Sequence, residues 1–92
     1  MILVTGSAGY IGSQITEYFE KNNINYIGID NFLYSIPANI TSKKRFIKTD
    51  FKDSKKITKI IKKFNIDTIM HCVADSYVLE GEFKKKKYIK NN

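Results

Sequence analysis

The feature that most constrains this chain is the stretch TGSAGYIGS, residues 5–13, which follows the short apolar run ILV. Glycine recurs in it at three-residue intervals, as Gly6, Gly9 and Gly12. Glycines between a buried strand and a helix are typical of the phosphate-binding turn of doubly wound α/β folds. We expect Gly6 to allow a tight turn with positive φ, Gly9 to let a pyrophosphate approach, and Gly12 to let the helix pack closely against the strand. The alternative is a glycine-rich turn without a ligand.

The rest of the sequence alternates between predicted strands and helices. Strands are expected at residues 2–5, 26–30, 45–50 and 67–74, and helices at residues 10 to about 22 and 54–64. Asp53 is a suitable N-cap for the second helix, and residues 82–92 can begin another one. This order predicts an α/β fold with a Rossmann-like doubly wound parallel sheet, of which only the first half, about four strands, is expected.

The length of 92 residues limits the chain to one small domain. No apolar run approaches the roughly 20 residues that span a bilayer, and no signal peptide is recognisable, so a cytoplasmic location without membrane contact is expected. The single cysteine, Cys72, excludes an internal disulfide, and one histidine, His71, leaves no ligand set for a structural zinc. Because both end an apolar strand, we expect them to be structural and not nucleophilic.

The net charge of +7 is unevenly distributed, since residues 43–92 carry all the basic residues except Lys21. In the second predicted helix the apolar residues fall on one face, as Ile57, Ile60, Ile61 and Phe64. The lysines fall on the other face, as Lys55, Lys56, Lys59, Lys62 and Lys63. A solvated lysine face is the expected interpretation. Nucleic-acid binding is the alternative, disfavoured because the chain has one arginine and no interleaving of aromatic and basic residues.

Two acidic residues close predicted strands. Asp30 lies about 20 residues beyond the glycines, where a carboxylate accepts hydrogen bonds from an adenosine ribose. A carboxylate there also repels a 2′-phosphate, which favours NAD over NADP as the cofactor. Asp50 is placed to meet the adenine edge. The alternative for both residues is to cap a turn or loop.

Several segments together resemble a known family. MILVTGSAGYIGS, GIDNF, TDFKD, IDTIMHCVADSYV and YIKNN resemble, in this order and over the whole chain, the N-terminal part of the UDP-glucose 4-epimerases. These enzymes are extended short-chain dehydrogenases/reductases of the NAD-dependent epimerase/dehydratase type, whose glycine spacing is GxxGxxG. Related nucleotide-sugar dehydratases share most of the segments, and a non-catalytic NAD-binding module is a further alternative. The stretches DNF and ADSYVLE favour the epimerase.

The resemblance implies a set of cofactor-binding residues. The turn before the first helix would bind the pyrophosphate, the ends of the second and third strands would hold the adenosine, and the end of the fourth would pass beneath the nicotinamide ribose. The residues carried over are Gly6, Gly9, Tyr10, Ile11, Gly12, Asp30, Asn31, Phe32, Ser35, Asp50, Phe51, Cys72, Val73, Ala74 and, from the next helix, Asn91. The chain departs from the family pattern at three of its positions, where Cys72 replaces Phe, Val73 replaces Ala and Lys85 replaces Pro.

The catalytic centre of the family is a YxxxK pair with a nearby Ser or Thr, and no tyrosine of this chain is followed four residues later by lysine. Loss of general acid–base catalysis typically costs about 10²- to 10⁴-fold in rate. The resemblance therefore implies a cofactor-binding part with no substrate domain, inactive alone, which meets a nucleotide sugar only if the C-terminal part is supplied. In the family's strand order the fourth strand would have an unpaired outer edge, open to a complementary fragment or a second copy.

Overall fold

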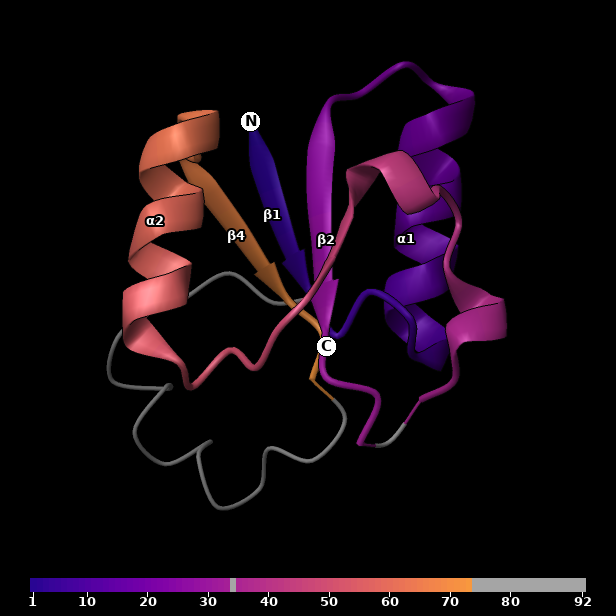
Figure 1. Ribbon diagram of the computed structural model, residues 1–92. Coiled ribbons are helices and arrows are strands. Elements are labelled where there is room, and N and C mark those ends of the chain that lie inside the picture. The colour runs from indigo at the N-terminus through magenta and orange to yellow at the C-terminus, as the bar shows by residue number, and fades with distance from the viewer. Residues whose placement is uncertain (34, 74–92) are drawn as a thin grey trace.

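The protein folds as an α/β unit in the computed structural model, which describes residues 1–33 and 35–73 (Figure 1). The elements are β1 (Ile2–Thr5), α1 (Tyr10–Lys21), β2 (Tyr26–Asp30), the short 3₁₀ turns η1 (Pro37–Asn39) and η2 (Lys43–Arg45), β3 (Phe46–Lys48), α2 (Ser54–Phe64) and β4 (Thr68–His71). The strands form one parallel sheet in the order β3-β2-β1-β4. The predicted first half of a Rossmann-like fold is confirmed, and the helix expected at 82–92 lies outside the described residues.

The two helices cover opposite faces of the sheet, as Figure 1 shows. Successive strand residues point to opposite faces, so neighbours in β1 belong to different cores. Leu3 packs with Ile57 and Ile60 of α2, whereas Val4 packs with Phe19 of α1. Among the described residues, neither helix has the length and apolar character needed to cross a membrane.

The outer strands are shorter than the sequence pattern predicts. β3 begins at Phe46 because η2 takes up the residues before it, and β4 stops at His71. Backbone pairing continues for one residue past each strand. The N–H of Thr49 donates to the carbonyl oxygen of Asp30 at 3.1 Å, and the N–H of Cys72 donates to the carbonyl oxygen of Thr5 at 3.0 Å. After β3 the chain turns at residues 51 and 52, so the apolar pattern there extends further than the ladder.

β3 and β4 are the two edges of the described sheet. β4 carries no charged residue, whereas β3 contains Lys48 and follows the basic turn η2. Charged side chains at an edge discourage pairing with another chain, so β4 is the less protected edge. That a complementary fragment or a second copy pairs with β4 stays a prediction.

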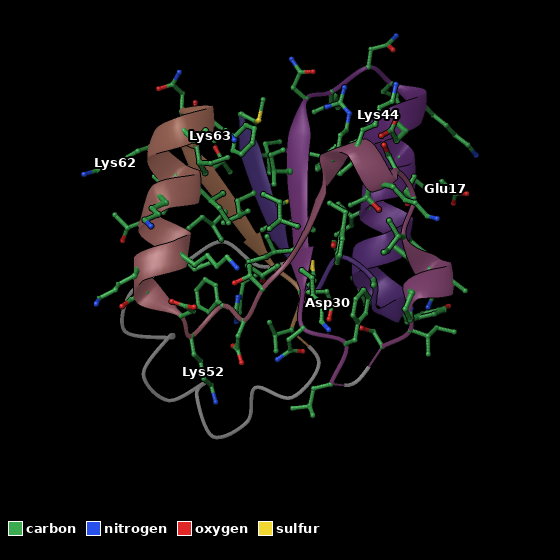
Figure 2. All side chains as sticks on the ribbon, in the orientation of Figure 1. Glu17, Asp30, Lys44, Lys52, Lys62 and Lys63 are labelled. Atoms are coloured by element: carbon green, nitrogen blue, oxygen red, sulfur yellow. The ribbon has the colours of Figure 1, made fainter. Side chains whose placement is uncertain are left out.

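Helix α2 has the amphipathic arrangement that its sequence predicts. Asp53 is its N-cap and accepts a hydrogen bond from the N–H of Lys56 at 3.2 Å, and Asn65, in the left-handed region at φ 54°, ends the helix. Ile57 and Ile60 are buried. The lysines of the opposite face are all exposed and form no ion pair with any described carboxylate, and Lys62 points outward in Figure 2.

A contact that the sequence pattern did not predict joins the glycine turn to β2. Gly28, in the middle of β2, faces Ser7, whose Oγ and Cβ would lie 2.7 and 2.8 Å from a Cβ placed on Gly28. Ser7 also donates from its N–H to the carbonyl of Ile29 at 3.0 Å. The absence of a side chain at Gly28 therefore lets the turn lie directly on the sheet.

We expect Gly28→Ala to destabilise the protein by about 1–3 kcal/mol, because the new methyl group overlaps the Ser7 side chain. Urea unfolding followed by circular dichroism measures this change. The double variant Ser7→Gly/Gly28→Ala removes the overlapping atoms and should recover part of the loss. Equal stability of Gly28→Ala and the unsubstituted protein would contradict this packing.

Asp53→Ala should cost about 1 kcal/mol of stability, because the N–H of Lys56 loses its cap. The matched control is Asp53→Asn, since asparagine caps helices about as well as aspartate does. The same urea unfolding experiment compares them, and an equal loss in both variants would show that charge and not capping matters.

Candidate functional site

The carboxyl ends of the strands meet at one edge of the sheet. The arrows of β1, β2 and β4 point to this edge in Figure 1, and the turn between β1 and α1 lies beside it. β1 pairs with β2 on one side and with β4 on the other. The strand order therefore runs outward from β1 in one direction through β2 and β3, and in the other direction to β4. Ligands of open α/β sheets bind in the crevice outside such a switch point.

The backbone of the glycine turn depends on two glycines. Gly6 has φ +66°, as predicted, and a Cβ on it would lie 2.5 Å from the carbonyl oxygen of Cys72. A Cβ on Gly12 would collide with the carbonyl oxygen of Gly6. The close approach predicted for Gly12 thus exists, but the helix approaches the turn after β1 and not the strand itself.

Gly9 differs from these two glycines. Its φ is −81°, which any residue adopts, and a Cβ on it would meet only the carbonyl oxygen of Gly6, at 3.3 Å. The backbone therefore suits any residue, but an added Cβ would press on the Gly6 carbonyl oxygen, which would have to shift by a few tenths of an ångström. Apart from this oxygen and the adjacent residues, no described atom lies within 4 Å of that Cβ position, so a ligand can approach the backbone here.

Helix α1 begins at this turn with its amide groups available. Gly9 is the N-cap and offers no side-chain hydrogen bond, and the first turn contains no acidic residue. The first N–H groups of a helix have no intrahelical acceptor, and the helix dipole makes this end attractive to anions by about 0.3–1 kcal/mol. Tyr10 is 76% exposed and Ile11 43% exposed, so the start of the helix faces solvent.

Asp30 joins the glycine turn to the loop that follows β2. Its carboxylate is only 8% exposed and accepts from the N–H of Ala8 at 2.9 Å on Oδ2. On Oδ1 it accepts from the N–H of Phe32 and from the hydroxyl of Ser35, both at 2.8 Å. In Figure 2 it lies at the carboxyl end of β2. Asp30 therefore caps the glycine turn and the loop after β2, which was the alternative to ribose binding.

This capping leaves acceptor capacity on the Asp30 carboxylate. A carboxylate has about four lone-pair sites, and the described residues donate three hydrogen bonds to it. Among residues 1–33 and 35–73 nothing else donates to it, which leaves one site, on Oδ2, for a hydroxyl group such as that of a ribose. The residues present therefore fit a bound dinucleotide, and capping and ribose binding do not exclude each other.

The end of β3 lies against the loop that follows β2. Asn31 donates from its side-chain amide to Asp50 Oδ2 at 3.2 Å, and Asp50 Oδ1 accepts from the N–H of Lys52 at 2.8 Å. Asp50 thus caps its own loop, which was the alternative to adenine contact. The ring of Phe51 lies 4.7 Å from that of His71, so this side chain packs inward.

His71 and Cys72 have environments that suit structural residues. His71 is buried, and its Nδ1 lies 2.8 Å from the hydroxyl of Thr5. Burial raises the pKa of the Cys72 thiol to about 11, so the thiol stays protonated near neutral pH. No group of three or more metal-binding side chains occurs among residues 1–33 and 35–73.

The structure brings most of the predicted residues to one edge, where Gly6 lies against Cys72, Asp30 against Ser35, and Asn31 against Asp50. Val73 follows β4, whereas Ala74 and Asn91 lie outside the described residues. Sequence reasoning missed Thr5, Ser7 and Gly28. A lone glycine inside a predicted strand was the available signal for a close backbone contact.

Comparison with known proteins agrees with this geometry. The chain matches the NAD dependent epimerase/dehydratase family over residues 2–92. A UDP-glucose 4-epimerase of Lactobacillus helveticus is 33% identical over 91 residues, covering 99% of this chain and 28% of the relative. A dTDP-glucose 4,6-dehydratase of Salmonella typhimurium is 34% identical over 84 residues, covering 84% of this chain and 23% of the relative.

A solved structure supports the same relationship. The UDP-glucose 4-epimerase of Thermus thermophilus, crystallised in complex with NAD, aligns with a TM-score of 0.72 at 27% identity, covering 80% of this chain and 24% of that one. The chain spans about a quarter of the length of these relatives. On both sequence and fold, it belongs to the NAD-dependent epimerase/dehydratase family.

Proposed function

We propose that this chain is the NAD-binding portion of a UDP-glucose 4-epimerase. The observation that carries the proposal is the hydrogen bond from the N–H of Ala8 to Asp30, 2.9 Å long, which sets a ribose-type carboxylate directly against the glycine turn. A pyrophosphate-binding turn and a ribose acceptor thereby lie side by side, as a dinucleotide requires. The Thermus relative solved with NAD has the same fold over this region.

Each part of the site has a separate task in this proposal. The amide groups at the start of α1 bind the pyrophosphate, and Gly9 keeps the approach to them open. Asp30 binds the adenosine ribose, while Asn31 and Asp50 line the adenine end. Cys72 and Val73, after β4, lie toward the nicotinamide side. NAD, when bound, supplies a reversible hydride acceptor.

The reaction itself requires residues that these 92 do not contain. General acid–base chemistry in this family depends on a YxxxK pair, which the sequence lacks. We therefore propose that the chain binds NAD without catalysing epimerisation, and that a nucleotide sugar binds only together with a C-terminal part. The dehydratase relative is about as similar as the epimerase relative, and the DNF and ADSYVLE stretches favour the epimerase.

Asp30→Asn should weaken NAD binding about 10- to 100-fold, because a charged acceptor for the ribose hydroxyl is replaced by a neutral amide. Isothermal titration calorimetry on the folded chain measures the dissociation constant. Asp67→Asn is the matched control, since this exposed aspartate precedes β4 at the other end of the strand. Failure of the folded, unsubstituted chain to bind NAD at millimolar concentration would overturn the proposed function.

Gly9→Ala separates ligand binding from folding. Because the added methyl group meets only the Gly6 carbonyl oxygen, at 3.3 Å, we expect the variant to fold after a small shift of the turn, with a loss of stability of about 1 kcal/mol. NAD binding should fall by at least about tenfold, because the methyl group occupies the space through which the pyrophosphate approaches. Circular dichroism checks the fold and calorimetry the affinity. Unchanged affinity in the folded variant would exclude this part of the site from the interface with NAD.

A further inference from the structure

Phe32, two residues after Asp30, has an unusual backbone conformation. Its φ is +63°, in the left-handed region that a bulky residue rarely adopts. In this conformation its N–H donates to Asp30 Oδ1 at 2.8 Å, which closes a tight turn on the carboxylate. A strained conformation persists only where the surrounding structure holds it. The contacts of the Phe32 side chain therefore decide whether this turn keeps its shape.

The ring of Phe32 is anchored on the neighbouring strand, β3. It stacks on the ring of Phe46, with centroids 5.4 Å apart and planes at 30°. The ammonium of Lys48 lies 5.8 Å from the centroid of the same ring. An aromatic stack also buries apolar area, whereas a cation–π contact of an exposed lysine is weak. Phe46 is therefore the main anchor of Phe32.

Phe46 itself is set back from the candidate site. In the parallel pairing of β2 and β3 it is opposite Gly28, two residues before Lys48, which is the register partner of Asp30. Its side chain has no polar atom and is partly buried. Any influence of Phe46 on a ligand at the carboxyl edge is therefore transmitted through the Phe32 ring and the turn that carries it.

The Phe32 turn fixes the orientation of the Asp30 carboxylate. Oδ1 accepts from the N–H of Phe32 and from the hydroxyl of Ser35, both at 2.8 Å. With two donors on Oδ1, the other oxygen is directed to the N–H of Ala8, at 2.9 Å, and this is the oxygen with a site left for a ribose hydroxyl.

We propose that Phe46 is a positioning residue for dinucleotide binding. By stacking on Phe32 it holds the turn after β2, and the turn holds the Asp30 carboxylate in the orientation that binds the ribose. The inference rests on the proposed function and concerns the same site. It assigns a role in that site to a residue of β3 that contacts neither the glycine turn nor Asp30 through a hydrogen bond.

Calorimetric titration of the folded 92-residue chain with NAD tests this proposal. Phe46→Leu keeps an apolar side chain but removes the stack, so NAD binding should weaken about 3- to 10-fold, because the binding-competent turn is populated for less of the time. Phe46→Tyr keeps the ring and should bind NAD within about twofold of the unsubstituted chain.

Phe32→Gly removes the stack from its other side. Glycine adopts a positive φ without strain but has no ring to anchor the turn, so NAD binding should weaken about as much as in Phe46→Leu. Because Phe32 lies in the loop after β2 and not in the sheet, this variant tests the stack even if Phe46→Leu fails to fold. Circular dichroism on each variant shows whether the chain is folded.

Ile47→Val is the matched control. Ile47 adjoins Phe46 on β3 but packs with Ile57 and Ile60 of α2 on the opposite face of the sheet. A small loss of apolar volume there should leave NAD affinity within about twofold of the unsubstituted chain, because this face does not contact the Asp30 turn.

A double-variant cycle with Asp30→Asn separates positioning of the carboxylate from a general loosening of the sheet. Without the charged acceptor there is nothing to position, so Phe46→Leu should change NAD affinity by less than about twofold in this background. An equal loss in both backgrounds, or a folded Phe46→Leu that binds NAD as well as Ile47→Val does, would overturn the role of Phe46 alone. A folded, unsubstituted chain that binds no NAD would overturn the proposed function and this inference together.

Discussion

The carboxylate of Asp30 is the interaction on which the rest of the site depends. It closes β2, accepts from the backbone of the glycine turn through Ala8, and accepts from the following loop through Phe32 and Ser35. The glycine turn and this loop are thereby held together at one edge of the sheet. Because the group is buried, removal of the carboxylate would leave the donors of Ala8, Phe32 and Ser35 without this partner, which is costly.

The glycine turn can reach this carboxylate because several side chains are missing. Gly28 leaves room for Ser7 on the sheet, and Gly12 leaves room for the turn against the helix. Gly6 supplies the left-handed backbone conformation in the turn. These three glycines serve the fold directly, whereas packing makes a milder demand at Gly9, where a Cβ would meet only the Gly6 carbonyl oxygen, at 3.3 Å. In the proposed function, Gly9 is the glycine beside which the pyrophosphate approaches the backbone.

The charge distribution has two separate consequences. The lysines of α2 face solvent on the side opposite the buried isoleucines, so they keep this face of the helix hydrated without taking part in the core. Lys48 belongs to a different part of the molecule, the edge strand β3, where it lies beside an aromatic ring and the Asp30 turn. The same residue type therefore covers a helix face in one place and lies beside an aromatic ring at a sheet edge in another.

Sequence patterns were sufficient for the elements and their order. The helical period of α2, the apolar runs of β1 and β2, the Asp53 cap and the positive φ of Gly6 were all predictable, because each depends on neighbours within a few residues. The ends of β3 and β4 were less predictable. They depend on where the neighbouring strand turns away, which local pattern does not record.

The amino-acid sequence alone thus determines the α/β alternation, the glycine turn and the acidic residue at the end of β2. Only the tertiary structure decides that Asp30 also caps two segments, that Asn31 meets Asp50, and that Gly28 receives Ser7. Strand order and register bring these residues together from separate parts of the chain. A contact of that kind has no local signature, because neither partner changes the propensity or periodicity of its own segment.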